Sequence, residues 1–153
     1  MSSGIVVLVA ALAAGVLLSV LKTWYDGRFR ATRVIEGRAV DETERPADRV
    51  TAEDIGAELG ERATLLQFSS AFCAPCRATR RVLAEVESMV DGVRHVEIDA
   101  ESHLELVRRL NIMRTPTVLV LDAAGGTVTR ASGQPRKADV IAALGAAVDR
   151  RAS

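Results

Sequence analysis

Hydrophobic residues are distributed unevenly along this chain, and its first segment is almost continuously apolar. Residues 1–21 contain no charged side chain, and 16 of those 21 residues are apolar. As a helix, the 20 uncharged residues from Ser2 to Leu21 would span about 30 Å, the hydrocarbon thickness of a bilayer. Trp24 and Tyr25 follow at once, as in an interfacial aromatic belt. The pattern predicts one transmembrane anchor helix over residues 1–22, inserted through residues 2–21.

A cleaved signal peptide is the alternative interpretation of this segment. It requires positive charge ahead of the apolar run and a small-residue cleavage site behind it. Only the terminal amine is positive before Ile5, and no convincing small-x-small site precedes Lys22. These flanks favour an anchor that is retained.

The charges beside the run predict its orientation. Basic residues follow it within a short distance, and none precedes it: Lys22, Arg28, Arg30, Arg33 and Arg38. Because positive flanks stay in the cytoplasm, the rest of the chain is expected on the cytoplasmic side. Arg supplies 18 of the 20 basic residues, a bias that resembles bacteria with GC-rich genomes. We expect a single-pass protein of the bacterial cytoplasmic membrane.

Residues 23–48 are polar and weakly periodic, which predicts a juxtamembrane tether, although Ala31–Val34 has the character of a short strand. Residues 49–153 then alternate between helical and strand patterns. The predicted helices are 51–59, 76–90, 104–110 and 136–150, and the predicted strands are 63–69, 93–99, 117–121 and 127–131.

This order predicts an α/β domain. The alternating first part implies a parallel, right-handed unit, and the terminal hairpin adds antiparallel strands. The result is a mixed central sheet with helices on both faces. Two capping-box patterns, Thr51 with Asp54 and Ser102 with Glu105, predict helix starts. Gly60 and Asn111 are the predicted ends of those helices.

Composition and charge exclude several functional classes. The chain carries 20 Lys and Arg against 20 Asp and Glu, so no net field draws it to nucleic acid. Two cysteines are too few for a disulfide-rich scaffold or a four-cysteine zinc site. His95 and His103 are not spaced like a ligand pair, so no metal is expected.

The chemistry lies in the spacing Cys73-Ala74-Pro75-Cys76 at a predicted strand-to-helix junction. A helix N-terminus favours a thiolate at Cys73, and Cys76, one turn inside, can resolve a mixed disulfide. Pro75 is tolerated in a first helical turn. Arg77, Arg80 and Arg81 add positive charge, although for Arg80 and Arg81 a solvated helix face is the favoured interpretation. Two buried structural cysteines are the alternative for the pair.

The motif Phe72-Cys73-Ala74-Pro75-Cys76 resembles the Trp-Cys-Gly-Pro-Cys motif of the thioredoxin family. Thr115-Pro116-Thr117 resembles the family's cis-proline loop, and Gly133 the glycine after its hairpin. The resemblance covers roughly residues 50–150. It implies a thioredoxin-like fold, an attacking thiol at Cys73, a resolving thiol at Cys76, and a backbone at Thr115 that pairs with an extended substrate.

The departures from the family pattern concern proton handling and the groove. Gln67 stands where the family has a buried Asp, and His95 where it has a neighbouring Lys. Gln67 cannot titrate, so we hypothesise that His95 takes over part of the proton handling; a hydrogen-bonded, half-buried histidine is the alternative. Phe72 replaces Trp, Ala74 replaces Gly, and Thr115 brings a hydroxyl that could approach the sulfurs.

The sequence therefore predicts a membrane-anchored thiol–disulfide oxidoreductase that needs no cofactor beyond its redox-active disulfide. Its partners would be a client protein disulfide and an electron-donating thiol protein, and in the cytoplasm it would act as a reductase. Three alternatives keep the scaffold: an extracytoplasmic protein of cytochrome maturation, a sulfur relay, and a binding module with incidental cysteines.

Overall fold

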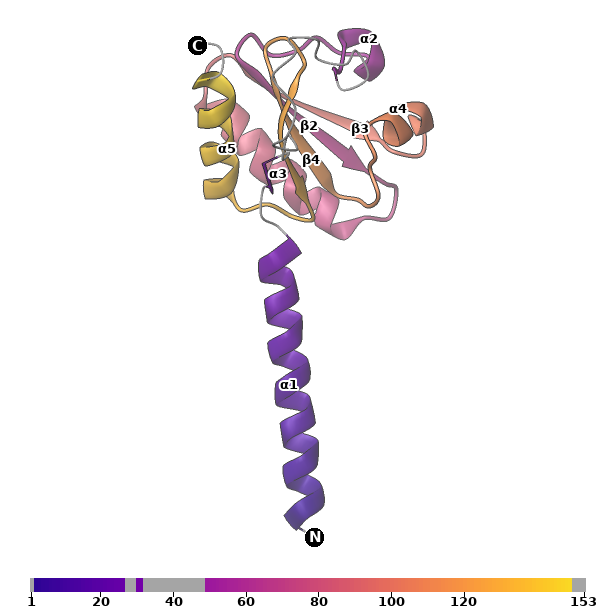
Figure 1. Cartoon of the computed structure of the whole chain (residues 1–153), viewed down its shortest axis with the longest axis vertical. Coiled ribbons are helices and arrows are strands. Elements are labelled where there is room, and N and C mark those ends of the chain that lie inside the picture. Colours follow the sequence, from indigo (N-terminus) through magenta and orange to yellow (C-terminus); the bar gives the residue numbers. More distant parts are fainter. Residues whose placement is uncertain (1, 27–29, 32–48, 150–153) are drawn as a thin grey trace, which may run out of the picture.

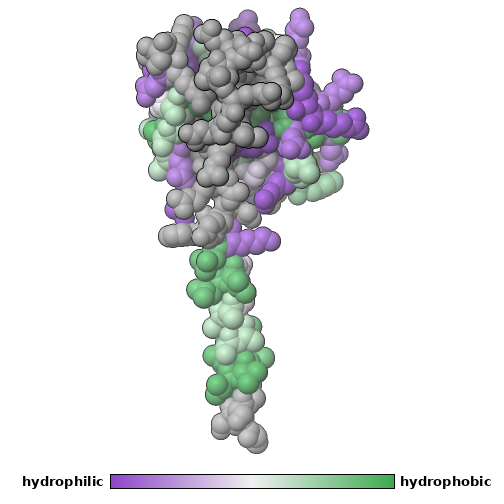
Figure 2. Space-filling view, viewed as in Figure 1, coloured by the Kyte–Doolittle hydropathy of each residue, from purple (hydrophilic) through white to green (hydrophobic). Residues whose placement is uncertain are grey.

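The computed structural model describes residues 2–26, 30–31 and 49–149. Helix α1 (Ser2–Asp26) extends away from the α/β domain formed by the rest (Figure 1). The side chains of residues 6–22 are exposed, and apolar residues dominate the surface of the helix (Figure 2). Among the described residues, none of the helices combines the length and the apolar character that crossing a membrane requires.

The domain is built on a mixed five-stranded sheet, as predicted, with the order β1-β5-β4-β2-β3. β2 pairs in parallel with β3, and the other neighbours are antiparallel. The strands are β1 (Arg30–Ala31), β2 (Ala63–Ser69), β3 (Val93–Asp99), β4 (Thr117–Asp122) and β5 (Thr127–Ser132).

Helices cover both faces of this sheet, which explains why β2 and β4 are buried along almost their whole length. Leu65 joins the cluster that packs against α3 (Ala74–Met89) and α5 (Lys137–Asp149). Leu66 and Phe68 join the opposite cluster, with residues of α2 (Ala52–Ile55) and α4 (Leu104–Arg109). Because successive strand residues point to opposite faces, both core clusters draw on the same central strand.

The first strand differs from the prediction. The sequence favours a strand over 31–34, whereas β1 covers Arg30 and Ala31 and pairs with Arg130 and Thr129 of β5. Residues 32–34 lie outside the described part of the chain. β1 adds a short edge strand from a segment whose polar composition suggests a tether. The division into 1–22, 23–48 and 49–153 stays a prediction.

Helix ends show where local patterns mislead. The Thr51–Asp54 capping box is confirmed, but α2 ends at Gly56, in the left-handed region (φ 63°), and not near Leu59. The predicted capping box of Ser102 is wrong, because its hydroxyl donates to Asp99 Oδ2 (2.7 Å) and His103 becomes the N-cap of α4.

The other helix boundaries agree closely with the prediction. Asn111 has a φ of 52° just after α4, as expected of a helix stop. α3 begins at Ala74, two residues before the predicted start. α5 runs over 137–149, and the predicted end at Arg150 lies outside the described residues.

Candidate active site

The two cysteines lie where β2 leads into α3, and they form a disulfide with a Cα–Cα distance of 5.2 Å. Cys73 is the N-cap of α3, and its Sγ accepts a hydrogen bond from the backbone N–H of Cys76 (3.1 Å). Cys73 is half-buried, whereas Cys76 is only 2 % exposed. Pro75 fits in the first turn, as predicted. The geometry gives one accessible sulfur at a positive helix end and one protected partner.

The basic residues near the start of α3 lie on its exposed face. Arg77 and Arg81 are exposed. Arg80 is exposed as well, as the favoured interpretation predicted, and it also pairs through Nε with Glu97 of β3. The pair, which the sequence did not predict, forms because α3 packs against the sheet so that its fourth residue after Cys76 reaches the β3 edge.

The cis-proline loop contacts the segment that precedes the cysteines. The Thr115–Pro116 bond is cis, as the resemblance implied. Thr115 Oγ1 lies 2.9 Å from Ser70 Oγ, so its hydroxyl contacts Ser70. The backbone N–H of Cys73 donates to the carbonyl of Ser70 (3.4 Å), which links the loop to the active cysteine. Nothing in the sequence pattern singled out Ser70.

Gly133 holds the other side of the proline loop. Its N–H donates to the carbonyl of Pro116 (2.7 Å), and its φ of 95° lies in a region that favours glycine. Thr117 begins β4, and its hydroxyl donates to the carbonyl of Arg114 (2.7 Å). These contacts fix Pro116, which is buried.

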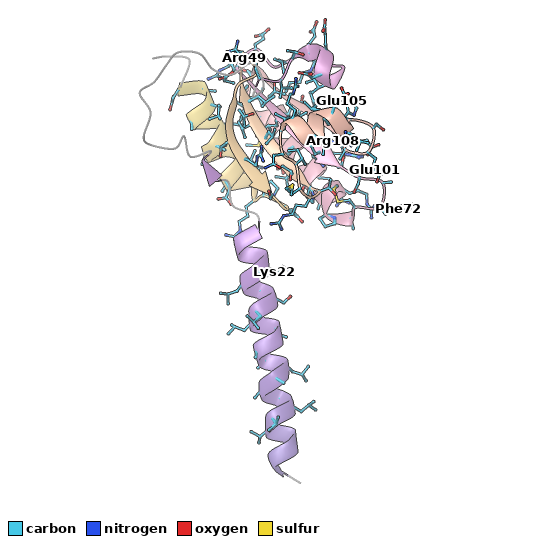
Figure 3. All side chains as sticks on the ribbon, turned by 45° about the vertical axis from the view of Figure 1, so that its right-hand side comes forward. Lys22, Arg49, Phe72, Glu101, Glu105 and Arg108 are labelled. Carbon is cyan, nitrogen blue, oxygen red and sulfur yellow. A yellow bond between two sulfur atoms is a disulfide. The ribbon has the colours of Figure 1, made fainter. Side chains whose placement is uncertain are left out.

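Apolar side chains project outward beside the disulfide. Phe72 is fully exposed and points away from the domain (Figure 3). Met113, in the loop that leads to Thr115, is 84 % exposed. Ala74 is exposed as well. Phe72 therefore presents its apolar ring to solvent next to Cys73.

Behind Cys76, a buried amide links the active site to β3. Gln67 is wholly buried, and its Nε2 donates to the carbonyl of Cys76 (3.0 Å) and to Glu97 Oε1 (3.4 Å). Its Oε1 lies 3.2 Å from His95 Nε2. An amide oxygen only accepts, so His95 carries its proton on Nε2. The structure thus brings Gln67 and His95 together. Gln67 contacts the backbone carbonyl of Cys76 and not its sulfur.

Glu97 also belongs to the site, although no motif in the sequence indicated it. It accepts from Ser69 Oγ (2.7 Å) and pairs with Arg80, and β2–β3 register places it opposite Gln67. The alternation of side chains along residues 93–99 places Glu97 and His95 on the same face of the strand. This is the feature of the sequence that could have identified Glu97.

The pKa values of these groups follow from their surroundings. Burial lowers the pKa of His95, although the carboxylates of Glu87 and Glu97 act in the opposite direction. Burial alone would raise the pKa of Glu97, but the hydrogen bonds from Arg80 and Ser69 outweigh it and the net shift is downward. The site therefore favours an anionic Glu97 and a neutral His95.

No group of three His, Cys, Asp or Glu side chains that could hold a metal occurs within the described residues. His103, the second histidine, contacts the backbone carbonyl of Asp99 through Nδ1 (3.0 Å).

The family model for thioredoxin matches residues 49–146 of this chain. A thioredoxin of Bacillus subtilis (strain 168) is 30% identical over 91 residues, which are 59% of this chain and 88% of that protein. Spinach chloroplast thioredoxin f (short form) superposes with a TM-score of 0.51 at 21% identity, covering 57% of this chain and 78% of that one. Fasciola hepatica thioredoxin gives a TM-score of 0.51 at 18% identity, covering 57% and 83%.

These likenesses cover the domain that carries the disulfide and the cis-proline loop. Thioredoxins use a redox-active disulfide and no cofactor. The chain therefore belongs to the thioredoxin family and is a thiol–disulfide oxidoreductase.

Proposed function

We propose that this protein is a membrane-anchored reductase of protein disulfides, with Cys73 as the attacking thiol and Cys76 as the resolving thiol. The observation that carries the proposal is the unequal exposure of the two sulfurs at the start of α3, where Cys73 is accessible and Cys76 is buried. A nucleophile must reach its client, and a resolving thiol must be kept from other partners.

The reaction consumes one client disulfide and forms the Cys73–Cys76 disulfide. The Cys73 thiolate attacks one client sulfur, and the other client sulfur leaves as a thiolate that takes up a proton. Cys76, once deprotonated, attacks Cys73 Sγ in the mixed disulfide, and the second client sulfur leaves. The client gains two electrons and two protons. Another thiol protein returns two electrons to the Cys73–Cys76 pair.

Membrane anchoring is supported by the first segment of the chain. Residues 2–21 carry no charge, and apolar side chains of α1 are exposed, among them Val6, Leu8, Leu12 and Leu17 at 62–66 %. Leaving so much apolar surface in water is costly. The proposed anchor includes residues 2–5, whose side chains lie outside the described part of the chain. The basic residues after it support a cytoplasmic domain at a bacterial cytoplasmic membrane.

The reductase proposal is tested by insulin reduction with the full chain in detergent, using dithiothreitol as electron donor. Wild type is expected to accelerate the precipitation of insulin chains, and Cys73→Ser to abolish turnover. Cys76→Ser is expected to accumulate a mixed disulfide with a client, which Cys73→Ser cannot form. Turnover that survives in Cys73→Ser would refute the assigned roles.

A further inference from the structure

We propose that the active-site disulfide faces the membrane surface, so that its clients are disulfides in the membrane-proximal segments of membrane proteins. The inference rests on the membrane anchor proposed above. The direction in which the chain enters the sheet after α1 places this disulfide on the side of the anchor.

The strand registers fix that direction. Paired residues of neighbouring strands form rows across the sheet. One row runs from Arg30 of β1 to Leu66 of β2, through Arg130 and Leu119. The next row runs from Ala31 of β1 to Leu65 of β2, through Thr129 and Val120. β1 and β2 therefore run in opposite directions. The chain enters β1 from the end of the sheet at which β2 leaves it, and that is the end that leads to Cys73.

The short connection keeps α1 at this end. Only residues 27–29 separate Asp26 of α1 from Arg30, so the two Cα atoms are at most about 15 Å apart. Without β1, the first fixed point would be Arg49, which bridges Gly126. The 23 intervening steps could then reach about 80 Å and allow any orientation of the domain. The pairing of β1 with β5 therefore shortens the connection between α1 and the sheet to residues 27–29.

The pictures agree with this topology. Figure 1 shows α1 leaving the domain at the end where β2 runs into α3. In Figure 3, Phe72 lies at that end, toward Lys22 of α1, whereas Arg49 lies at the far end of the domain. A membrane that holds α1 is thus close to the exposed face of Phe72.

Depth measurements on the full chain in phosphatidylcholine vesicles test the orientation. A bimane label is placed on Cys73 in a Cys76→Ser variant, or at Ala124 in a Cys73→Ser/Cys76→Ser/Ala124→Cys variant. Ala124 is exposed and follows Asp122, which lies opposite the first residue of β2 at the far end of the sheet. The quencher is a nitroxide on the lipid headgroup. We expect clearly stronger quenching of the label on Cys73.

The outcomes separate the inference from the function on which it rests. Equal quenching of the two labels, or stronger quenching at residue 124, in vesicles that carry the protein on flotation would overturn the inference and leave the anchor intact. Protein that does not float with the vesicles overturns the anchor and the inference together. Matching circular dichroism spectra of the two labelled variants confirm that both are folded.

The client class is tested with two lipid-linked disulfide peptides that share the same surface concentration. One holds its disulfide at the headgroup level, and the other carries it on a spacer of about 20 prolines, roughly 60 Å long. Wild type is expected to reduce the first at least about tenfold faster. A flexible insertion of about 30 Gly and Ser residues after Asp26 should abolish this preference while insulin reduction stays unchanged. Equal rates in wild type would show that clients need not be membrane-proximal.

Discussion

His95 couples the fold to pH through its buried ring. Burial lowers the pKa of His95 below its ordinary value of 6.5, so the fold favours the neutral ring. Near pH 6.5 and just below it, the unfolded chain therefore binds more protons than the native state. Linkage then requires the free energy of unfolding to rise with pH through this window and to level off above it. His95→Gln should flatten that rise, as measured by urea unfolding of the full chain in detergent between about pH 5 and 8.

His103→Gln is the matched control, because it removes the chain's second histidine, whose Nδ1 lies 3.0 Å from the backbone carbonyl oxygen of Asp99. It should keep the rise seen in wild type. The lowered pKa values of Glu97, Asp54 and Asp99 act in a more acidic window, where stability is lost as the pH falls. A rise that persists unchanged in His95→Gln would contradict the assignment.

Thr79 carries a buried hydroxyl without a hydrogen-bond partner in the described part of the chain. Leaving such a group unpaired costs about 1–3 kcal/mol. Thr79→Val keeps the shape and the β-branch of the side chain, so we expect the free energy of unfolding to increase by about 1 kcal/mol. Urea unfolding of both proteins at neutral pH measures the difference.

Thr117→Val is the control for this substitution, since Thr117 is equally buried but donates to the carbonyl of Arg114 at 2.7 Å. Its replacement should lower the free energy of unfolding by about 1–2 kcal/mol. Equal losses in both variants would show that Thr79 does have a partner.

At the scale of elements, Glu97 connects β3 with both β2 and α3. Its carboxylate accepts from Ser69 and Gln67 on β2 and pairs with Arg80 on α3. Glu97→Ala leaves the buried hydroxyl of Ser69 without this acceptor, so we expect a loss of about 1–3 kcal/mol in the free energy of unfolding. Glu97→Gln keeps an acceptor oxygen and should cost less. Urea unfolding measures both.

The control is Glu85, which pairs with Lys137 between α3 and α5 at a largely exposed position. Glu85→Ala should cost only about 0.2–1 kcal/mol, as exposed ion pairs do. If Glu97→Ala cost no more than Glu85→Ala, Glu97 would be an ordinary surface partner and its place in the site would be lost.

The same elements show what a sequence can predict. β2 and β4 are identified correctly because burial on both faces leaves short runs that are rich in apolar residues. The end of α2 at Gly56 and the cap of α4 depend on single local hydrogen bonds for which several residues compete. The cysteine pair and the proline loop are recognisable motifs. The Arg80–Glu97 pair is not, because it depends on how α3 is rotated against β3, a tertiary property.

At the scale of the whole molecule, β1 joins two parts that the sequence presents as separate. A segment of two residues can pair with β5 only because the sheet edge is already formed by distant residues, so the pairing leaves little local signal. Its consequence is large, since the chain between α1 and the domain is reduced to residues 27–29. With α1 as the proposed membrane anchor, this pairing would set the orientation of the domain at the membrane.

The side of the membrane on which the domain lies is open to a direct measurement in cells. Five basic residues follow the apolar run within a short distance and none precedes it, so the domain is expected in the cytoplasm. In intact bacterial cells that express the Cys76→Ser variant, a membrane-impermeant maleimide should leave Cys73 unlabelled until the cells are lysed. The control is a Cys73→Ser/Cys76→Ser/Ala124→Cys variant, which carries its cysteine at the opposite end of the domain. It shows whether Cys73 is unlabelled only because the membrane covers it. Labelling of either residue before lysis would place the domain outside and favour an extracytoplasmic role.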